Sequence, residues 1–423
     1  MNNADFFVEP VRETPIINEV DVLVCGGGFA GVAAAVAAAR NGASVMLVER
    51  YGFLGGLATG ALVITTPPLN NGINREIARR LMAWQSYAPN SDKENATASD
   101  MIDGADSLLP YDPEATKFEF VRMLLDERVE ILFHSYIADT LCTDGHIDGV
   151  VIENKAGRSG IRAKFIIDAT GDADIAAQAG APVRTVERPI TMMFNMAEVD
   201  SERALEHLGK WTGLKKFMRE AIAKGEIDFD LGVDADFGAP GIFAADLIHK
   251  GQLNIWGGML YSNQSLDPAQ RTRAEIVTRD HAFRMANFLK KNLPGFENAR
   301  LEQMSTEVGI RATRNLDGND VPSKQEISRG EFKDTIARPY LGKSLAVPYR
   351  SLLPKDVDNL LVAGRCISAH DDIMGRLRLI PVCSATGEAA GVAAAMAVAQ
   401  DITAQAVDIG QLQAQLTEQG VEL

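Results

Sequence analysis

Cysteine is scarce in this sequence, with four residues among 423, at positions 25, 142, 366 and 383. The four are widely scattered and form no Cys-x-x-Cys pair, which excludes the usual zinc motifs, a disulfide framework and a redox-active dithiol. A free cysteine otherwise behaves as a small hydrophobic residue. We therefore expect four buried thiols and no metal site.

Positive charge is also in short supply. The chain has 42 Lys and Arg against 57 Asp and Glu, a formal net charge of −15. No run of Lys or Arg forms the basic stripe that a phosphate backbone requires, so we expect no nucleic-acid partner. The N-terminal stretch carries Asp5, Glu9 and Glu13 and lacks the basic and apolar regions of a signal peptide, which indicates a cytoplasmic protein.

Long uninterrupted apolar runs are missing as well. The stretch 22–39 is broken by Gly26, Gly27 and Gly28, and the stretch 389–399 is too short to cross a bilayer. We therefore expect no membrane partner. Because a single core stops growing at roughly 250 to 300 residues, this length predicts two domains with room to bury a large ligand.

A nucleotide-binding pattern opens the chain. The apolar run 21–25 is followed by Gly26-Gly-Gly-Phe-Ala-Gly31 and by an alanine-rich segment, 32–40, with high helix propensity. The next apolar run, 44–48, ends at Glu49, where a carboxylate can accept hydrogen bonds from an adenosine ribose. Strand, glycine turn, helix, strand and acid together predict a dinucleotide site, but the pattern does not separate NAD from FAD.

The glycines of this turn have distinct physical roles. The first permits a tight turn, the second lets a diphosphate approach the backbone, and the third lets helix and strand pack closely. The helix N-terminus then faces the anionic diphosphate. The residues of the turn that we assign to the cofactor site are Gly26, Gly28, Phe29, Ala30 and Gly31.

A second glycine-rich loop, 50–59, stands where a simple NAD domain would start another helix. Its doublet Gly55-Gly56 resembles the second fingerprint of flavoproteins, which runs beside the diphosphate and ribitol of FAD. Leu57 replaces the arginine that usually flanks this doublet. The residues that the resemblance assigns to FAD here are Glu49, Arg50, Gly55, Gly56, Leu57, Ala58 and Thr59.

Later segments extend the resemblance. The run 165–171 is similar to the Ala-Thr-Gly strand of FAD domains, 309–314 to a G-x-R-x-x-R element, and 359–391 to the closing segment of the FAD-dependent oxidoreductase family, within the glutathione-reductase-like flavoprotein superfamily. Asp172 and Asp174 lie where a following helix needs an N-cap. The further cofactor residues implied by the resemblance are Ile137, Ala169, Thr170, Gly171, Gly364, Arg365, Ser384 and Ala385.

Two of these positions carry a physical expectation. Arg365 stands where many flavoproteins have a ribitol-binding Asp, and a cation there would neutralise the diphosphate. Pro381 suits a first helical turn, and the segment 382–399 continues without proline. We expect the N-terminus of this last long helix to face the O2 and N1 edge of the isoalloxazine, which becomes anionic on reduction.

The fold class predicted is α/β. A Rossmann-like FAD-binding domain, a parallel sheet with a β-meander, is expected from residues 1–66, 113–186 and 336–423. An inserted α+β substrate domain is expected at 187–335. The stretch 67–112, with Ser, Asn and Asp clusters between 90 and 106, reads as a loop-rich excursion near the active site.

Three side chains are candidates for catalysis. His370 follows the strand that ends at 364, where a histidine can accept a proton as hydride leaves carbon, or can simply pair with Asp371 or Asp372. Arg378 and Arg311 can clamp a substrate carboxylate, or can hold the two domains together. Both alternatives stay open at the level of sequence.

These residues predict an FAD-dependent oxidoreductase that transfers hydride from a small polar organic substrate to flavin N5. No second glycine fingerprint for NAD(P)H is present, so an acceptor such as oxygen, a quinone or a redox protein would remove the electrons. Alternatives are a flavin-dependent reductase of an activated alkene, a flavoprotein whose FAD is structural, and an NAD-dependent dehydrogenase. The sequence is compatible with a homo-oligomer.

Overall fold

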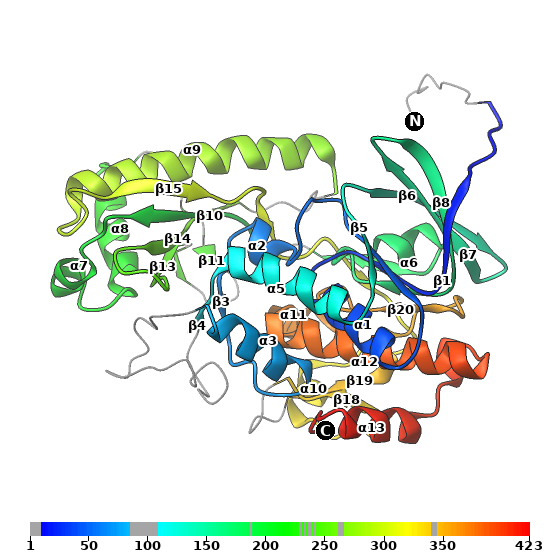
Figure 1. Ribbon diagram of the computed structural model, residues 1–423. Helices are drawn as coiled ribbons and strands as arrows, with labels where there is room; N and C mark the ends of the chain where they lie inside the picture. Colours follow the sequence, from blue (N-terminus) through cyan, green and yellow to red (C-terminus); the bar gives the residue numbers. More distant parts are fainter. Residues whose placement is uncertain are drawn as a thin grey trace.

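The computed structural model shows two lobes joined by a long interface (Figure 1). The described residues are 10–84, 109–186, 188–227, 231, 233–234, 239–240, 242–260, 266–339 and 345–423. The Ser, Asn and Asp clusters between 90 and 106 therefore lie outside the described residues.

The first lobe is built on a seven-stranded sheet in the order β5-β2-β1-β8-β7-β6, with β20 paired to β8. The strands are β1 (Ile16–Cys25), β2 (Val45–Val48), β5 (Glu130–Leu132), β6 (Tyr136–Thr143), β7 (His146–Asn154), β8 (Gly157–Asp168) and β20 (Leu360–Val362). The pairs among β5, β2, β1, β8 and β20 are parallel, whereas β6, β7 and β8 form an antiparallel meander. This confirms the predicted Rossmann-like sheet with its meander.

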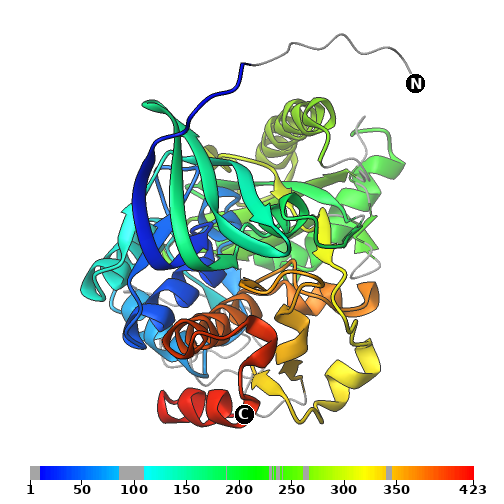
Figure 2. The ribbon, with the colours of Figure 1, turned by 90° about the vertical axis from the view of Figure 1, so that its right-hand side faces the viewer.

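Two long helices pack together beneath this sheet. They are α1 (Phe29–Arg40) and α12 (Ile380–Gln400), and α5 (Pro113–Asp126), α3 (Ile73–Met82) and α13 (Ile409–Glu418) flank them. Figure 2 shows the meander above α12 and α13. The alanine-rich sequences of α1 and α12 present almost no bulk, so the two backbones approach closely.

Helix α12 forms where the sequence predicted a long helix after Pro381, but its apolar stretch is longer than the run 389–399. The apolar run 389–399 is part of a 21-residue helix that is long and apolar enough to cross a membrane. However, 78% of its apolar window is buried inside the protein. The helix is therefore accounted for as a core element, and its apolar composition serves packing against α1 and the sheet.

The second lobe contains a five-stranded sheet in the order β13-β14-β10-β15, with β16 on β10. Its elements are β10 (Ile190–Ala197), α7 (Ser201–Leu208), α8 (Gly213–Ala223), β13 (Ile242–Asp246), β14 (Leu253–Leu260), α9 (Pro268–Asn292), β15 (Arg300–Met304) and β16 (Gly309–Ile310). Helix α9 covers one face of the sheet (Figure 1). The apolar core of this lobe runs from Ile190 to Ile310, whereas we drew the inserted domain to residue 335.

The remaining elements are short. They are α2 (Leu57–Gly60), β3 (Thr65–Thr66), β4 (Leu109–Pro110), α6 (Asp174–Gln178), β9 (Val183–Thr185), β11 (Val233–Asp234), β12 (Ala239–Pro240), β17 (Arg314–Leu316), α10 (Lys324–Arg329), β18 (Thr335–Ala337), β19 (Val347–Pro348), α11 (Asp371–Leu377) and the 3-10 helices η1 (Tyr349–Leu352) and η2 (Ala404–Ala406). Ile327 of α10 and Ile336 of β18 pack in the core of the first lobe. The chain thus returns to that lobe soon after β16.

The expectation of four buried thiols is wrong for two of the cysteines. Cys25 and Cys366 are buried in the sheet core, but Cys142 and Cys383 are half-buried. Cys142 lies on the meander strand β6, which has one exposed face, and Cys383 lies in the first turn of α12. Desolvation raises the pKa of Cys383 to about 12, so its thiol stays protonated.

Candidate functional site

The first glycine turn has the geometry that its sequence predicts. Gly26 has φ +107°, and a Cβ there would lie 2.6 Å from the carbonyl oxygen of Ala169. A Cβ on Gly31 would lie 1.8 Å from the carbonyl oxygen of Gly26. Both positions therefore exclude a side chain for internal reasons, namely a left-handed turn and the contact of helix α1 with the strand.

Gly28 is different, because the space above it is open. A Cβ on Gly28 would meet only the Cα of Gly56, at 3.9 Å. The two glycine loops run side by side: Gly28 and Gly55 form an isolated parallel bridge, and the Gly55 amide donates to the Gly27 carbonyl at 2.8 Å. They line a cradle that a side chain would fill.

The donors at this cradle fit a diphosphate. Helix α1 begins at Phe29 with no side-chain cap and no acidic residue in its first turn, and α2 begins after Gly56 in the same way. Amide N–H groups at uncapped helix starts bind anions. The open cradle and its donors are therefore compatible with the diphosphate of FAD.

Glu49 lies beside this cradle at the end of β2. It is 6% exposed, its Oε2 accepts from the Gly27 amide at 2.6 Å, and its Oε1 accepts from the Tyr51 amide at 2.9 Å. Burial raises its pKa, and the two amide bonds oppose that rise. A carboxylate has further lone pairs, so Glu49 still has acceptor capacity for a ribose.

Helices α1 and α12 are parallel, and the N-terminus of α12 extends beyond the N-terminus of α1. A Cβ on Gly387 would lie 2.1 Å from the Ala30 carbonyl oxygen, and one on Gly391 would lie 2.2 Å from that of Ala34. Ala30 is the second residue of α1 and Gly387 the eighth of α12, so the start of α12 extends about six residues, or roughly 9 Å, beyond the start of α1. The first glycine turn and the first turn of α12 thus belong to one site.

The first turn of α12 offers fewer amides than its sequence suggested. Pro381 has no N–H, and the amides of Val382 and Cys383 both donate to the Leu379 carbonyl at 3.0 Å. Within the described residues, the Ile380 amide is the one left in this turn for a ligand.

Arg365 is placed differently from the expectation. Its Nη2 lies 2.5 Å from Asp172 Oδ1, so the guanidinium pairs with a carboxylate beside Gly171. Its Nε is buried without a hydrogen-bond partner in the described part of the chain. The ion pair lowers the pKa of Asp172 and leaves Arg365 one buried donor for a further acceptor.

Asp172 and Asp174 do not cap the helix that follows them, so the capping prediction is wrong. The N-cap position of α6 is Ala173, which has no side-chain acceptor. The amides of Ile175 and Ala176 instead donate to Asp168 at 3.0 Å. Burial raises the pKa of Asp168 to about 6.

Three other predicted cofactor residues have partners within the protein. The Thr59 hydroxyl donates to the Leu54 carbonyl at 2.7 Å, Arg50 pairs with Glu307 at 3.2 Å, and the Gly364 amide donates to the Thr386 hydroxyl at 3.1 Å. The remaining predicted positions are Leu57 and Ala58 in α2, Ile137 in β6, Ala169, Thr170 and Gly171 after β8, and Ser384 and Ala385 in α12, and their contact with FAD stays a prediction.

The three catalytic candidates lie in different segments of the chain. His370 caps α11 with its side chain 59% exposed, and its Nδ1 lies 3.0 Å from Asp372 Oδ1, which matches the alternative of a paired loop histidine. Arg311 is buried and donates to the Pro189 carbonyl at 3.4 Å. Arg378 follows α11, directly before α12. Their catalytic roles stay predictions.

A second-lobe surface that the sequence did not reveal contacts the chain just after α2. The Asn254 amide Nδ2 donates to Asn195 at 2.8 Å and lies 3.5 Å from the Leu62 carbonyl, two residues past α2. The Trp256 indole donates to Asn254 at 2.8 Å, and the Phe243 ring lies 5.1 Å from that of Trp256. Strands β10, β14 and β13 thus present asparagine and aromatic side chains toward the first lobe.

Comparison with known proteins identifies the family of the chain. The family described as "FAD dependent oxidoreductase" matches residues 21–342 and 339–416. Digeranylgeranylglycerophospholipid reductase 2 of Methanopyrus kandleri is 31% identical over 204 residues, 45% of this chain and 48% of that protein. Thiamine thiazole synthase of Methanococcus maripaludis is 29% identical over 168 residues, 37% of this chain and 57% of that protein.

The chain spans about half the length of the curated relatives it matches. Among solved structures, a geranylgeranyl bacteriochlorophyll reductase-like protein of Thermoplasma acidophilum has a TM-score of 0.47 at 15% identity, covering 95% of this chain and 82% of that one. With the family match spanning nearly all of the sequence, the cofactor is FAD and the chain belongs to the FAD dependent oxidoreductase family.

Proposed function

We propose that this enzyme exchanges a hydride between a small polar organic substrate and FAD, with the substrate held between the first turn of α12 and the second sheet. The observation that carries the proposal is the parallel packing of α1 on α12 through Gly387 and Gly391, which brings both helix N-termini to one site. Bound there, FAD supplies the hydride chemistry at N5.

The residues of the chain itself bind FAD and orient it. The cradle at Gly28 and the uncapped start of α1 take the diphosphate, and Glu49 takes the adenosine ribose. The Ile380 amide and the dipole of α12 face the edge of the ring on which negative charge develops.

The substrate side is built by the second lobe. Trp256 and Phe243 give an apolar wall, in which Asn254 holds the Trp256 indole through a hydrogen bond. Arg311, next to the edge strand β16, is the cation of this lobe that suits a substrate carboxylate. An oxidant such as oxygen, a quinone or a redox protein would complete the cycle of a dehydrogenase or an oxidase.

A reductase of an activated alkene is the second candidate. The Methanopyrus relative is named a reductase, and the aromatic wall of Trp256 and Phe243 would accept an apolar chain. The same hydride step then runs toward the substrate.

An anaerobic titration of the purified, FAD-loaded protein separates these candidates. Bleaching of the oxidised flavin by a panel of hydroxy acids, amino acids and alcohols supports the dehydrogenase. Bleaching by none of them, with reoxidation of the chemically reduced flavin by an activated alkene, supports the reductase. A flavin that no substrate of either class reduces or reoxidises identifies a structural FAD, and absence of releasable flavin contradicts the proposal altogether.

A further inference from the structure

Helix α3 meets α12 in a buried joint, which we call the α3 joint, made of Ile73 and Asn74 on α3 and Pro381, Ser384 and Glu388 on α12. Asn74 and Ser384 are fully buried and Glu388 is 6% exposed. The joint connects the start of the excursion predicted at 67–112 to the flavin-facing end of α12.

Asn74 holds the first turn of α12 at two points. Its Nδ2 donates to the Pro381 carbonyl at 3.0 Å, and its Oδ1 accepts from the Ser384 hydroxyl. The Ser384 hydroxyl oxygen also lies 2.9 Å from the Ile380 carbonyl oxygen, so its single proton is shared between the two acceptors. One buried amide side chain therefore bonds to Pro381 and Ser384, which both lie at the start of α12 and follow Ile380.

The position of this turn matters because so few of its amides are available. With Pro381 lacking an N–H and Val382 and Cys383 bonded to Leu379, the interaction of the helix end with a ligand depends on the direction of one amide. The field of a helix terminus falls off within its first turn, so a small rotation of that turn changes its interaction with a nearby charge.

We propose that Asn74 is a positioning residue for the flavin: by bonding Pro381 and Ser384, it holds the first turn of α12, and with it the Ile380 amide, in place and thereby raises the reduction potential of bound FAD. The inference rests on the proposed placement of FAD at the first turn of α12. Loss of the Asn74 amide frees the turn, weakens its stabilisation of the negative charge that reduction adds, and lowers the potential.

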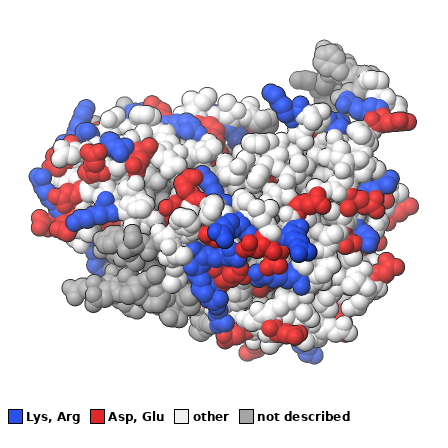
Figure 3. Space-filling model, in the orientation of Figure 1, with Lys and Arg blue, Asp and Glu red and all other residues white. Residues whose placement is uncertain are grey.

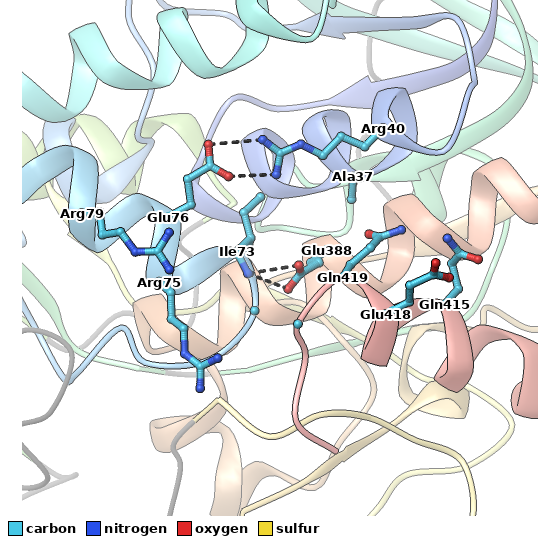
Figure 4. Close-up of a pocket in the computed structure, with 12 residues that line it drawn as sticks. Ala37, Arg40, Ile73, Arg75, Glu76, Arg79, Glu388, Gln415, Glu418 and Gln419 are labelled. Carbon is cyan, nitrogen blue, oxygen red and sulfur yellow. Dashed lines mark hydrogen bonds and ion pairs between the residues drawn. The ribbon is translucent and has the colours of Figure 1, made fainter.

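Glu388 provides a matched control within the same joint. Its two carboxylate oxygens accept from the Ile73 amide at 3.0 Å each, so it also fastens α3 to α12 through a buried hydrogen bond. Figure 4 shows it at the wall of a cavity of about 530 Å³ between α1, α3 and α13. Glu388 lies one turn beyond Ser384 and is not bonded to the first turn.

The test compares wild type, Asn74→Ala, Ser384→Ala and Glu388→Gln as FAD-loaded proteins at pH 6. Each is measured for FAD per chain, for thermal midpoint and for the midpoint potential of the flavin against a reference dye. At this pH the Glu388 carboxyl, whose pKa burial raises to about 7, is mostly protonated, so glutamine matches its charge.

We expect Asn74→Ala to lower the potential by about 30 mV, a tenfold shift of a two-electron equilibrium. Ser384→Ala, which removes one of the two bonds, shifts it less in the same direction, and supplies the result if Asn74→Ala does not fold. Glu388→Gln leaves the potential at the wild-type value. Variants that lose thermal stability but keep the wild-type potential overturn the inference alone, whereas a wild type that holds no FAD overturns the proposed placement.

Discussion

A methyl group at Gly28 would touch almost nothing in the protein itself, since its nearest neighbour is the Gly56 Cα at 3.9 Å. The backbone there is extended, with φ −74° and ψ −176°, and accepts alanine. Gly28→Ala should therefore leave the thermal midpoint of the FAD-free protein within about 2 °C of wild type. It should weaken FAD binding at least tenfold, or about 1.4 kcal/mol, in a fluorescence titration.

Gly31→Ala is the matched control, because its Cβ would lie 1.8 Å from the Gly26 carbonyl oxygen. This variant should lose stability with or without FAD. If Gly28→Ala binds FAD as tightly as wild type, the cradle is not the diphosphate site.

Glu388 should make stability depend on pH. Burial raises its pKa from 4.5 to about 7, so the folded state favours the protonated carboxyl. The resulting stabilisation is complete below pH 4.5 and is lost as pH rises through about 7, with a cost of up to about 3 kcal/mol at higher pH.

Glu388→Gln should remove this dependence and be more stable than wild type at pH 8, as measured by denaturant unfolding from pH 5 to pH 8. Parallel curves for the two proteins across that range would show that Glu388 is not the titrating group. The charged side chains Arg40, Glu76 and Arg75 line the same cavity and are retained in both proteins.

Side-chain partners were the least predictable features of the sequence. The glycines of the first turn were assigned correctly to a tight turn and to close packing because a missing Cβ is itself the signal. The residue that caps α6 was not predicted. Asp168 lies six residues before Asp174, where α6 begins, and its side chain comes close to the helix start only in the folded chain. Asn74 carried no motif, and its partners are separated from it by about three hundred residues.

At the scale of elements, the contact of α1 with α12 depends on glycine. Gly387→Ala would place a Cβ 2.1 Å from the Ala30 carbonyl oxygen, which forces the helices apart. We expect a loss of about 3 kcal/mol in unfolding free energy, as for other overpacked cores, together with weaker FAD binding.

Gly410→Ala in α13 is the comparison, since its Cβ would meet only Asp408 Oδ1 at 3.3 Å. Alanine is the better helix former, so this variant should match or exceed wild-type stability. Equal stability of both variants would mean that α1 and α12 are not packed as described.

The positions of the helices and strands were predictable from hydrophobic periodicity and from the glycine and proline residues between them. The strand at 21–25, the alanine-rich helix after it and the segment after Pro381 all formed where the sequence predicted them. The extent of α12 was predicted within two residues, but the burial of its polar residues Ser384, Thr386 and Glu388 was not. Each has a hydrogen-bond partner outside α12: Asn74 for Ser384, the Gly364 amide for Thr386 and the Ile73 amide for Glu388.

For the molecule as a whole, Asp172 is a junction between segments that are distant in sequence. Its carboxylate bonds Arg365 at 2.5 Å and Thr313 at 2.7 Å, and Arg271 at the start of α9 lies 3.8 Å away. Asp172→Asn leaves the Arg365 guanidinium buried without a counter-charge, so we expect a loss of about 3 to 5 kcal/mol on denaturant unfolding.

Arg271→Ala removes the more exposed partner, whose side chain is 34% exposed, and should cost at most about 1 kcal/mol. A small loss for both variants would argue that the Asp172 and Arg365 pair contributes little to joining the segments.

Positive and negative side chains are mixed on this surface and do not form one large patch of a single sign. Figure 3 shows Lys and Arg interspersed with Asp and Glu over α3 and α5. Arg80 there pairs with Glu76 at 3.0 Å, with Asp126 at 3.0 Å and with Glu119 at 3.4 Å. The composition predicted the sign of the net charge, but the pairing of these helices arises from the fold.

The global arrangement was predictable in outline because the nucleotide-binding pattern and the C-terminal segment both imply the same sheet. The residue at which the inserted domain ends was not predictable, because the sequences of β17 and α10 do not indicate on which lobe these elements pack. Composition and local pattern specify elements, whereas the choice of lobe depends on contacts between distant segments.

The most direct test of the account is a crystal structure of the protein with FAD. We expect the diphosphate against Gly28 and the uncapped start of α1, with the pyrimidine edge of the ring at the Ile380 amide, about 9 Å further along α12 as its 1.5 Å rise per residue requires. An FAD molecule bound away from either helix start, or a nicotinamide in its place, would contradict the account.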